Sequence, residues 1–179
     1  MPRTQIVIGL SGYVGTGKTS VSDWFIQNHG FRRASFADPI RKMFMALGLT
    51  EKELRDPVLK ETPNKRLLGR TPRYAMETLG TDWARKMMHP QFWVAQFALH
   101  IADMPFVICD DVRFQNEVEA MTELGAKVYR LNVPGREPRV PTDFEVQKLT
   151  GVIDLNNDFE HGGVTTKTLY RRIYEEVFA

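Results

Sequence analysis

Glycines, one lysine and several hydroxyl side chains crowd the stretch GLSGYVGTGKTSVSDWF, residues 9–25. Within it, Gly12, Gly17, Lys18 and Thr19 have the spacing G-x-x-x-x-G-K-[ST] of a phosphate-binding loop. Residues without a bulky side chain let backbone N–H groups wrap closely around phosphate oxygens, and the helix expected from Lys18 onward adds the positive end of its dipole. The sequence therefore predicts a site for a nucleoside triphosphate, in which Lys18 reaches the β and γ phosphates and Thr19 is a ligand of Mg²⁺.

Two acids and an arginine form a second group: Asp110, Asp111 and Arg113 follow the apolar run Phe106–Cys109. An acid at the carboxyl end of a strand beside the phosphate loop is well placed to hold the waters of Mg²⁺, and a nearby arginine can neutralise phosphoryl oxygens during transfer. We expect Arg113 and Asp111 to act in catalysis and Asp111 to serve the metal, with Asp110 as the other candidate for the metal. The alternative is a helix cap with an ion pair between Arg113 and Glu117.

A basic cluster lies in KETPNKRLLGRTPR, residues 60–73, which contains a single acid, Glu61. Arg70 and Arg73 lie on either side of Pro72, where a helix is expected to begin, and two guanidiniums at a helix entrance suit the phosphate of a second substrate. The other members of the cluster are as well explained by a solvated surface. They are Lys60, Lys65 and Arg66.

These groups need elements that position them, and strand-like and helix-like segments alternate along the chain. The expected strands are residues 4–10, 31–37, 105–111, 126–133 and 151–157. The expected helices are residues 18–28, 40–47, 114–124 and 166–178, with two more between 72 and 103 that break near His89 and Pro90. Asp38 and Pro39 are expected to be the N-cap and first position of the helix over 40–47.

This alternation predicts an α/β fold: a three-layer sandwich of one parallel five-stranded sheet with helices on both faces. We expect residues 1–179 to form a single domain with a mobile, substrate-binding insert at about 50–71, which is polar and hard to assign. A loop is expected around Pro134, Gly135, Pro138 and Pro141.

Composition limits the partners. A net charge of +2 over 179 residues is too small to indicate a nucleic-acid polymer, and we find neither a signal peptide nor a membrane span. One cysteine, Cys109, leaves no disulfide framework, which fits the cytoplasm. We expect small nucleotides as the partners of a monomer or a homodimer.

The chain resembles the deoxynucleoside monophosphate kinases of bacteriophages, a branch of the P-loop nucleoside monophosphate kinases. The resemblance runs in order from about Ile6 to Gly135, and VIDLNND is similar to the family's last strand. Besides the phosphate loop, it rests on the segments SFADPIRK, TPRYAMETLGTDWAR, FWVAQFA and VICDDVRFQNEVEAMTELGAKVYRLNVPG.

The resemblance implies a P-loop kinase fold and transfer of the γ-phosphoryl group of ATP, with Mg²⁺, to a deoxynucleoside monophosphate. It implies cytoplasmic localisation in the host if the chain is encoded by a phage. For ATP it implies the loop residues Gly12, Val14, Gly15, Thr16, Gly17, Lys18, Thr19 and Ser20. For the monophosphate it implies Arg73 and a turn formed by Gly80, Thr81 and Asp82, and for the transfer centre Asp111 and Arg113.

Two positions depart from the family pattern. Val14 and Gly15 stand where a phage relative has basic residues. Val133 stands in place of an arginine, which leaves Arg136 and Arg139 as candidates near the adenine.

Three residues keep two explanations each. Asp38 either contacts the acceptor or caps a helix, and Trp83 and Trp93 either stack on the base or belong to the core. At the level of function, two alternatives stay open. One is a kinase of another small acceptor, such as dephospho-coenzyme A or phosphomevalonate, and the other is a nucleotide-binding switch without catalysis.

Overall fold

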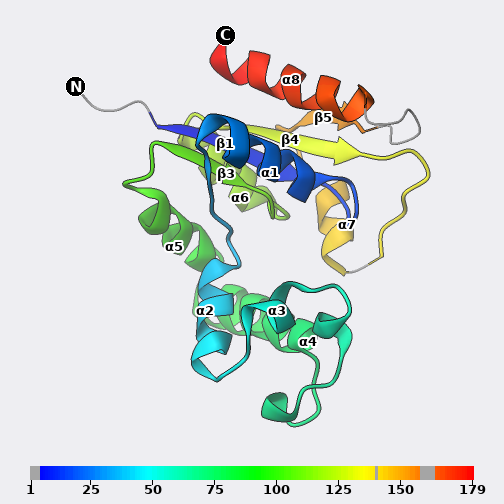
Figure 1. Cartoon of the computed structure of the whole chain (residues 1–179). Helices are drawn as coiled ribbons and strands as arrows, with labels where there is room; N and C mark the ends of the chain where they lie inside the picture. Colours follow the sequence, from blue (N-terminus) through cyan, green and yellow to red (C-terminus); the bar gives the residue numbers. More distant parts are fainter. Residues whose placement is uncertain (1–4, 140, 158–163) are drawn as a thin grey trace. The chain divides into compact units, whose positions relative to one another are not determined.

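The computed structural model describes residues 5–139, 141–157 and 164–179. Its strands form a parallel five-stranded sheet in the order β2-β3-β1-β4-β5 (Figure 1). This confirms the predicted sheet. The strands are β1 (Ile6–Ser11), β2 (Arg32–Arg33), β3 (Phe106–Cys109), β4 (Lys127–Asn132) and β5 (Ile153–Asn156).

Helices account for most of the remaining described residues. The α-helices are α1 (Lys18–His29), α2 (Asp38–Ala46), α3 (Glu51–Arg55), α4 (Pro72–Glu77), α5 (Phe92–Ile101), α6 (Gln115–Glu123), α7 (Pro141–Gln147) and α8 (Val164–Phe178). Two short 3₁₀ turns are η1 (Leu59–Glu61) and η2 (Lys65–Leu67), and η3 (Thr78–Met88) is a π-helix.

Backbone contacts divide the chain into two compact units. The sheet unit comprises residues 1–35 and 100–179, and the helical unit comprises residues 36–99. In the sequence, the helical unit is thus an insertion between β2 and β3 of the sheet unit. The prediction of a single domain with a mobile insert stays a prediction.

The sheet unit has three layers, because helices cover both faces of its sheet. Apolar side chains of α1 and α8, among them Phe25 and Ile173, form one buried cluster with residues of the strands. On the opposite face, Met121 of α6 packs so closely on Gly9 of β1 that a Cβ at Gly9 would lie 3.0 Å from its sulfur. Figure 1 shows α1 and α8 on one side of the strands and α6 on the other. The predicted three-layer sandwich is confirmed.

The phosphate loop lies at the carboxyl end of the central strand. β1 pairs with β3 on one side and with β4 on the other, so the sheet order reverses direction there. Ligands of open parallel sheets bind at such a point, beyond the carboxyl ends of the strands. The loop therefore occupies the place where this sheet architecture puts a ligand.

The helical unit has a core of its own. Its buried apolar residues come from α2, α3, η3 and α5 and include Phe44, Leu54 and Trp93. The polar segment 50–71 joins this unit through α3, whose N-terminus carries a reciprocal cap between Thr50 and Glu53. The segment is thus built of short helices rather than irregular chain.

Two expected element boundaries were wrong. The second strand is Arg32–Arg33 instead of residues 31–37, because β2 is an edge strand and the chain turns at Phe36 and Ala37 into α2. Asp38 is not the N-cap of this helix. Ala37 holds that position without a side-chain cap, and the Asp38 carboxylate pairs with Arg41 instead.

Two further expectations need correction. The proline-containing loop includes α7, which begins at Pro141; proline fits the first turn of a helix because its missing N–H would have no partner there. Gly80, Thr81 and Asp82 do not form a turn but belong to η3, which continues α4. No proline interrupts the chain between Pro72 and Pro90, so the helix runs on until His89. The predicted break near His89 and Pro90 is confirmed.

Other boundaries differ from the expected ones by a few residues, and Thr4 lies outside the described residues. No described helix has both the length and the apolar composition needed to cross a bilayer.

Candidate active site

Three glycines give the phosphate loop its shape. Gly12, Gly15 and Gly17 have φ angles of 134°, 81° and 93°, which side chains with a Cβ rarely adopt. At Gly12 the packing is also too close for another residue, since a Cβ would lie 2.5 Å from the carbonyl oxygen of Leu131 in β4. The loop is braced further by Asn157, whose buried side-chain amide donates to the carbonyl of Thr16 at 2.9 Å. The shape of the loop is therefore fixed by its glycines and by contacts with β4 and Asn157.

Lys18 directs its ammonium group back over the loop. Its Nζ donates to the carbonyl oxygens of Gly12 and Tyr13, each at 2.7 Å. Burial lowers the pKa of Lys18 from 10.5 to about 8, and the positive charge of the Arg113 guanidinium contributes a smaller part of this shift. Nearby carboxylates oppose the shift. Those carboxylates belong to Asp110, Asp143 and Asp111. The charges that act on Lys18 thus come from two other parts of the sheet unit, the segment after β3 and α7.

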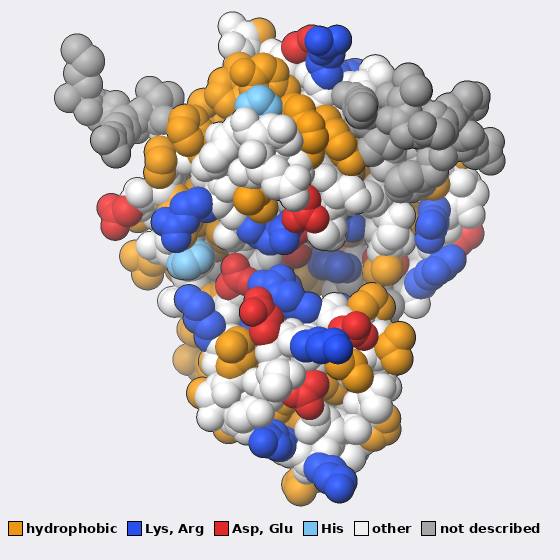
Figure 2. Space-filling view, viewed as in Figure 1, with side chains coloured by type: hydrophobic (Ala, Val, Ile, Leu, Met, Phe, Trp, Pro, Cys, Tyr) orange, Lys and Arg blue, Asp and Glu red, His pale blue; other side chains and the backbone are white. Residues whose placement is uncertain are grey.

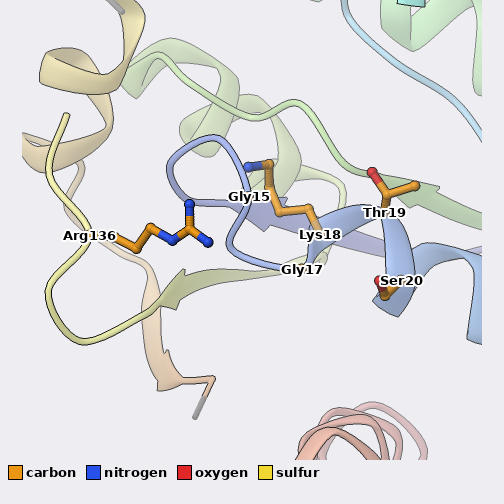
Figure 3. A pocket seen from close by; sticks show the side chains of 6 residues that line it. All are labelled: Gly15, Gly17, Lys18, Thr19, Ser20 and Arg136. Atoms are coloured by element: carbon orange, nitrogen blue, oxygen red, sulfur yellow. The ribbon is translucent and has the colours of Figure 1, made fainter. Parts of the chain in front are cut away.

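A cavity of about 510 Å³ opens beside the start of α1. Figure 3 shows Arg136, from the segment after β4, reaching toward the phosphate loop from the side opposite Thr19 and Ser20. The approach is close, because a Cβ at Gly15 would lie 2.9 Å from Nη1 of Arg136. Gly15 therefore leaves the space that Arg136 occupies. Lys18, Arg136 and the N-terminus of α1 together make this cavity attractive to anions.

The two acids after β3 have different partners. Asp110 forms an ion pair with Nε of Arg33 at 3.0 Å, and Nη2 of Arg33 contacts Asp23 of α1 at 2.8 Å. Asp111 accepts a hydrogen bond from the buried Cys109 thiol at 3.2 Å. Burial raises the pKa of Cys109, so this donor stays neutral at ordinary pH.

Arg113 contacts Glu117 through its backbone and α7 through its side chain. Glu117 is buried, and its carboxylate accepts from the backbone N–H groups of Arg113 and Phe114 at 2.7 and 3.1 Å, which caps α6. The Arg113 guanidinium instead donates to the hydroxyl of Thr142 at 2.7 Å and lies 3.6 Å from the Asp143 carboxylate. The cap of the alternative interpretation exists, and the described side-chain partners of Arg113 belong to α7.

In the helical unit, arginines surround Asp38. Its Oδ1 lies 2.6 Å from Nη1 of Arg41 and 3.4 Å from Nη2 of Arg55. Arg55 also pairs with Glu51 at 2.8 Å, so the two guanidiniums face two carboxylates. An anionic substrate would replace one of these carboxylates as the partner of an arginine. Sequence reasoning identified Asp38 but missed both arginines.

The expected pair at the start of α4 is divided between two kinds of partner. Thr71 caps the helix and Pro72 holds its first position, as predicted for this helix start. Arg73 pairs with Glu61 and lies 3.8 Å from Glu77, whereas the Arg70 guanidinium lies 4.9 Å from the ring centre of Tyr74. The structure therefore does not bring Arg70 and Arg73 onto one partner.

The remaining substrate candidates lie on or against η3. Trp93 is 2% exposed and donates its indole N–H to the carbonyl of Gly80 at 2.8 Å, which favours the core explanation over stacking on a base. Gly80 is buried against Ile40, whereas Asp82 is exposed and pairs with Lys86 at 2.7 Å. Thr81, the residue between Gly80 and Asp82, is half-buried.

Several residues of this site could not be predicted from the sequence, because no local motif marks them. Arg33 belongs to the short strand β2, Thr142 and Asp143 follow a proline-rich segment, and Asn157 directly follows β5. Among the described residues, no three histidine, cysteine or acidic side chains gather as a metal cluster.

Comparison with known proteins adds a relative and a fold. No protein-family profile matches the chain. A protein of Acanthamoeba polyphaga mimivirus, assigned as a deoxynucleotide monophosphate kinase, is 32% identical in an alignment that covers 86% of this chain and 89% of that protein.

Two solved structures share the fold at 16% identity. Shikimate kinase of Bacteroides thetaiotaomicron has a TM-score of 0.50, with 97% of this chain and 99% of that chain covered. A protein of Chloroflexus aurantiacus J-10-fl, assigned as a kinase, has a TM-score of 0.52, with 98% and 97% covered. The fold is that of the P-loop kinases.

Proposed function

Because this chain belongs to the family of deoxynucleotide monophosphate kinases, we propose that it transfers the γ-phosphoryl group of ATP to a deoxynucleoside 5′-monophosphate, giving ADP and the diphosphate. As a member of this family it is a phosphotransferase, so we set aside a nucleotide-binding switch without catalysis. What carries the proposal in the structure is the group of cations at the phosphate loop. Lys18 lies over the loop, Arg136 lies against Gly15, and Arg113 is close enough to lower the pKa of Lys18.

We assign the triphosphate of ATP to this loop. Backbone N–H groups around the three glycines, the N-terminus of α1, and the side chains of Lys18 and Arg136 bind its phosphates. The loop residues Val14, Thr16 and Ser20 belong to the same site by position. Arg136 restores a positive charge beside Val14 and Gly15, where the family pattern has basic residues.

Oxygen donors suitable for Mg²⁺ are present. The Thr19 hydroxyl and the Asp111 carboxylate are the groups that would hold it, which fits an ion that takes few protein ligands together with substrate phosphates. When bound, the metal neutralises charge on the phosphates during transfer. We choose Asp111 over Asp110 because Asp110 forms an ion pair with Arg33 at 3.0 Å.

The transfer itself needs charge neutralisation more than a general base. An oxygen of the acceptor phosphate forms a bond to the γ phosphorus, the bond to the bridging oxygen breaks, and ADP leaves with the electron pair. A phosphate monoester is largely dianionic at pH 7 because its second pKa is about 6, so its oxygen attacks without losing a proton. Lys18 and Arg113 stabilise the charge that moves between the two phosphates.

We assign the acceptor to the helical unit. The arginines beside Asp38, together with Arg73 and Arg70, supply cations for its phosphate, and Thr81 and Asp82 are the polar groups of η3 offered to the rest of the nucleotide. Arg73 is balanced by Glu61 and Glu77, so a phosphate must replace at least one carboxylate as its partner.

The test is a coupled assay of ADP release with Mg-ATP and each of the eight common ribo- and deoxyribonucleoside monophosphates. Dephospho-coenzyme A and phosphomevalonate represent the rival acceptors, and the Lys18→Ala protein measures the background. We expect at least one deoxynucleoside monophosphate to be phosphorylated much faster than either rival. If only a non-nucleotide acceptor drives ADP release, the chain is a kinase of another small molecule.

A further inference from the structure

The guanidinium of Arg113 is held from outside its own strand and helix. Its backbone N–H is fixed by Glu117, but its Nη1 donates to Thr142 at 2.7 Å and faces Asp143 at 3.6 Å. Both partners belong to the first turn of α7, 29 and 30 positions further along the chain. Arg113 side-chain placement therefore depends on where α7 lies.

Asp143 is suited to hold a cation rather than to meet solvent. Its side chain is completely buried, and its Oδ2 accepts from the backbone N–H of Arg139 at 3.0 Å, which leaves Oδ1 toward Arg113. A buried carboxylate is costly to keep charged unless cations and hydrogen bonds surround it. Asp143 also acts on Lys18, whose pKa it raises. The Asp143 carboxylate is thus one of the charges that act on Lys18 at the phosphate loop.

The far end of α7 is fixed to the sheet. Arg130 of β4 pairs with Asp154 of β5 through two contacts of 2.7 Å. The same guanidinium donates through Nη1 to the carbonyl oxygens of Val146 and Leu149, both at 3.2 Å, and of Gln147 at 3.4 Å. Val146 and Gln147 belong to the last turn of α7, and Leu149 lies two residues beyond its end. One arginine therefore binds the end of α7 to two strands.

From these contacts we propose that Thr142 and Asp143 are positioning residues, which hold Arg113 in the orientation needed for phosphoryl transfer. The proposal rests on the catalytic role that we propose for Arg113. α7, fixed at one end by Arg130, carries both residues on its other end, and Arg113 completes the connection to the strand end where Asp111 lies. Neither residue contacts the substrates in this account, because both act through the guanidinium.

Three single variants probe this connection. Thr142→Val removes the hydroxyl while keeping the shape, and Asp143→Asn removes the charge while keeping an oxygen for the Arg139 N–H. We expect each to lower kcat roughly 10- to 100-fold, because displacing a reacting group by about 1 Å can cost about 10²-fold in rate. KM for both substrates should change less than about threefold, because Arg113 acts in this proposal in the transition state, so that ground-state binding is little affected. Thr142→Ser restores the hydroxyl and should keep kcat within about twofold.

Glu145→Gln is the matched control. It removes one carboxylate from the same helix, but the Glu145 side chain is 42% exposed, whereas Asp143 is fully buried, and its described partner is Lys148 at 2.8 Å. Its kcat should stay within about twofold of the parent value. Circular dichroism and thermal unfolding of every variant show whether the fold is kept.

The deciding experiment is a double-mutant cycle with Arg113→Ala, measured as kcat with Mg-ATP and the best acceptor. If Thr142 and Asp143 act through Arg113, their substitutions should have little further effect once the guanidinium is gone. Thr142 carries no charge, so its effect cannot pass through the field at Lys18, and it decides the case if Asp143→Asn fails to fold. Equal losses in both backgrounds, or no loss from Thr142→Val, would overturn the proposal.

The cycle also separates this proposal from the one on which it rests. If Arg113→Ala lowers kcat but Thr142→Val does not, only the positioning role is lost. If Arg113→Ala itself leaves kcat unchanged, the catalytic role of Arg113 falls, and the positioning role falls with it.

Discussion

Lys18 concentrates the chemistry of the phosphate loop in one side chain. Its ammonium is buried, is hydrogen-bonded to two loop carbonyls, and is affected by acids from α7 and the segment after β3 and by one arginine. Such a charge is already in place before the reaction, and we propose that it stabilises the transferring phosphoryl group without reorganising at that moment. This makes Lys18 the residue at which the account is easiest to test.

Lys18→Ala should keep the fold but lower turnover by a factor on the order of 10² or more, because a preorganised charge on the phosphoryl group is lost. Steady-state rates with saturating Mg-ATP and acceptor measure this, with circular dichroism as the control for folding. Near-normal turnover in a folded Lys18→Ala protein would remove the catalytic assignment.

The lowered pKa of Lys18 predicts how ATP affinity depends on pH. Only the ammonium form pairs with phosphates, and with a pKa of about 8 it is lost as pH rises through 8. The Kd for ATP should therefore rise roughly tenfold between pH 7 and pH 9. Equilibrium titrations of the full chain with ATP measure this.

Lys18→Arg is the matched control for this dependence, because arginine stays protonated over the whole range. In that variant the Kd for ATP should change little between pH 7 and pH 9. A flat Kd in the parent protein, or the same slope in Lys18→Arg, would show that another group titrates.

Arg73 and Arg113 should differ in the constant that they affect. Arg73 lies with the acceptor candidates, so Arg73→Ala should mainly raise KM for the monophosphate, whereas Arg113→Ala should mainly lower kcat. Each loss should amount to roughly 2–4 kcal/mol, as for single transition-state donors. Kinetics with both substrates varied decide between them. An Arg113→Ala protein with only a raised monophosphate KM, beside an inactive Arg73→Ala protein, would mean that the roles are reversed.

At the scale of elements, η3 is the part of the fold that departs most from expectation. π-helices are rare and usually a single turn long, yet η3 spans Thr78–Met88. Gly80 sits within it without a positive φ, packed so that a Cβ would lie 3.1 Å from Ile40, and its carbonyl accepts from Trp93. The Trp93 bond therefore ties η3 to α5.

Trp93→Phe should destabilise the protein by about 1–3 kcal/mol, because it removes the indole donor and leaves the Gly80 carbonyl without it in the core. A chain of this size loses roughly 2–4 °C in Tm per kcal/mol, which calorimetry can resolve. Trp83→Phe is the control, since Trp83 is half-buried and its described contact is an aromatic one with Phe92. Equal losses in both variants would argue against a special role for the Gly80 bond.

Sequence periodicity was enough for most elements and for the phosphate loop. The loop is a local motif bounded by an apolar strand and a helix, so neighbouring residues contain all the information that places it. Periodicity does not distinguish the hydrogen bonding of a π-helix from that of an α-helix, so it did not predict the π-helix η3. It did not predict α7 either, because the proline-rich segment before this helix is typical of a loop.

The candidate site was predictable where its residues follow strand ends, as with Asp110, Asp111 and Arg113. It was not predictable where partners come from distant segments. Arg33 meets Asp110 across 77 positions, and Asp143 meets Arg113 across 30 positions. Only the pairing of β2 with β3, and the contact of α7 with the segment after β3, reveal these pairs.

At the scale of the whole molecule, the site residues divide between the two units. The phosphate loop, Asp111, Arg113 and Arg136 belong to the sheet unit, and the acceptor candidates belong to the helical unit. On the described part of the face in Figure 2, basic and acidic side chains are interspersed, and no broad patch of one sign covers it. The cations that matter in this account are therefore placed individually rather than as a charged surface.

The most direct test of the central claim follows the phosphoryl group itself. The full chain is incubated with Mg²⁺, ATP labelled in its γ phosphate, and the deoxynucleoside monophosphate that gives the fastest ADP release, with the Lys18→Ala protein as background. We predict that the label appears in the β phosphate of the deoxynucleoside diphosphate, in equal amount to the ADP formed. Label released as inorganic phosphate, with no labelled diphosphate for any deoxynucleoside monophosphate, would contradict the account.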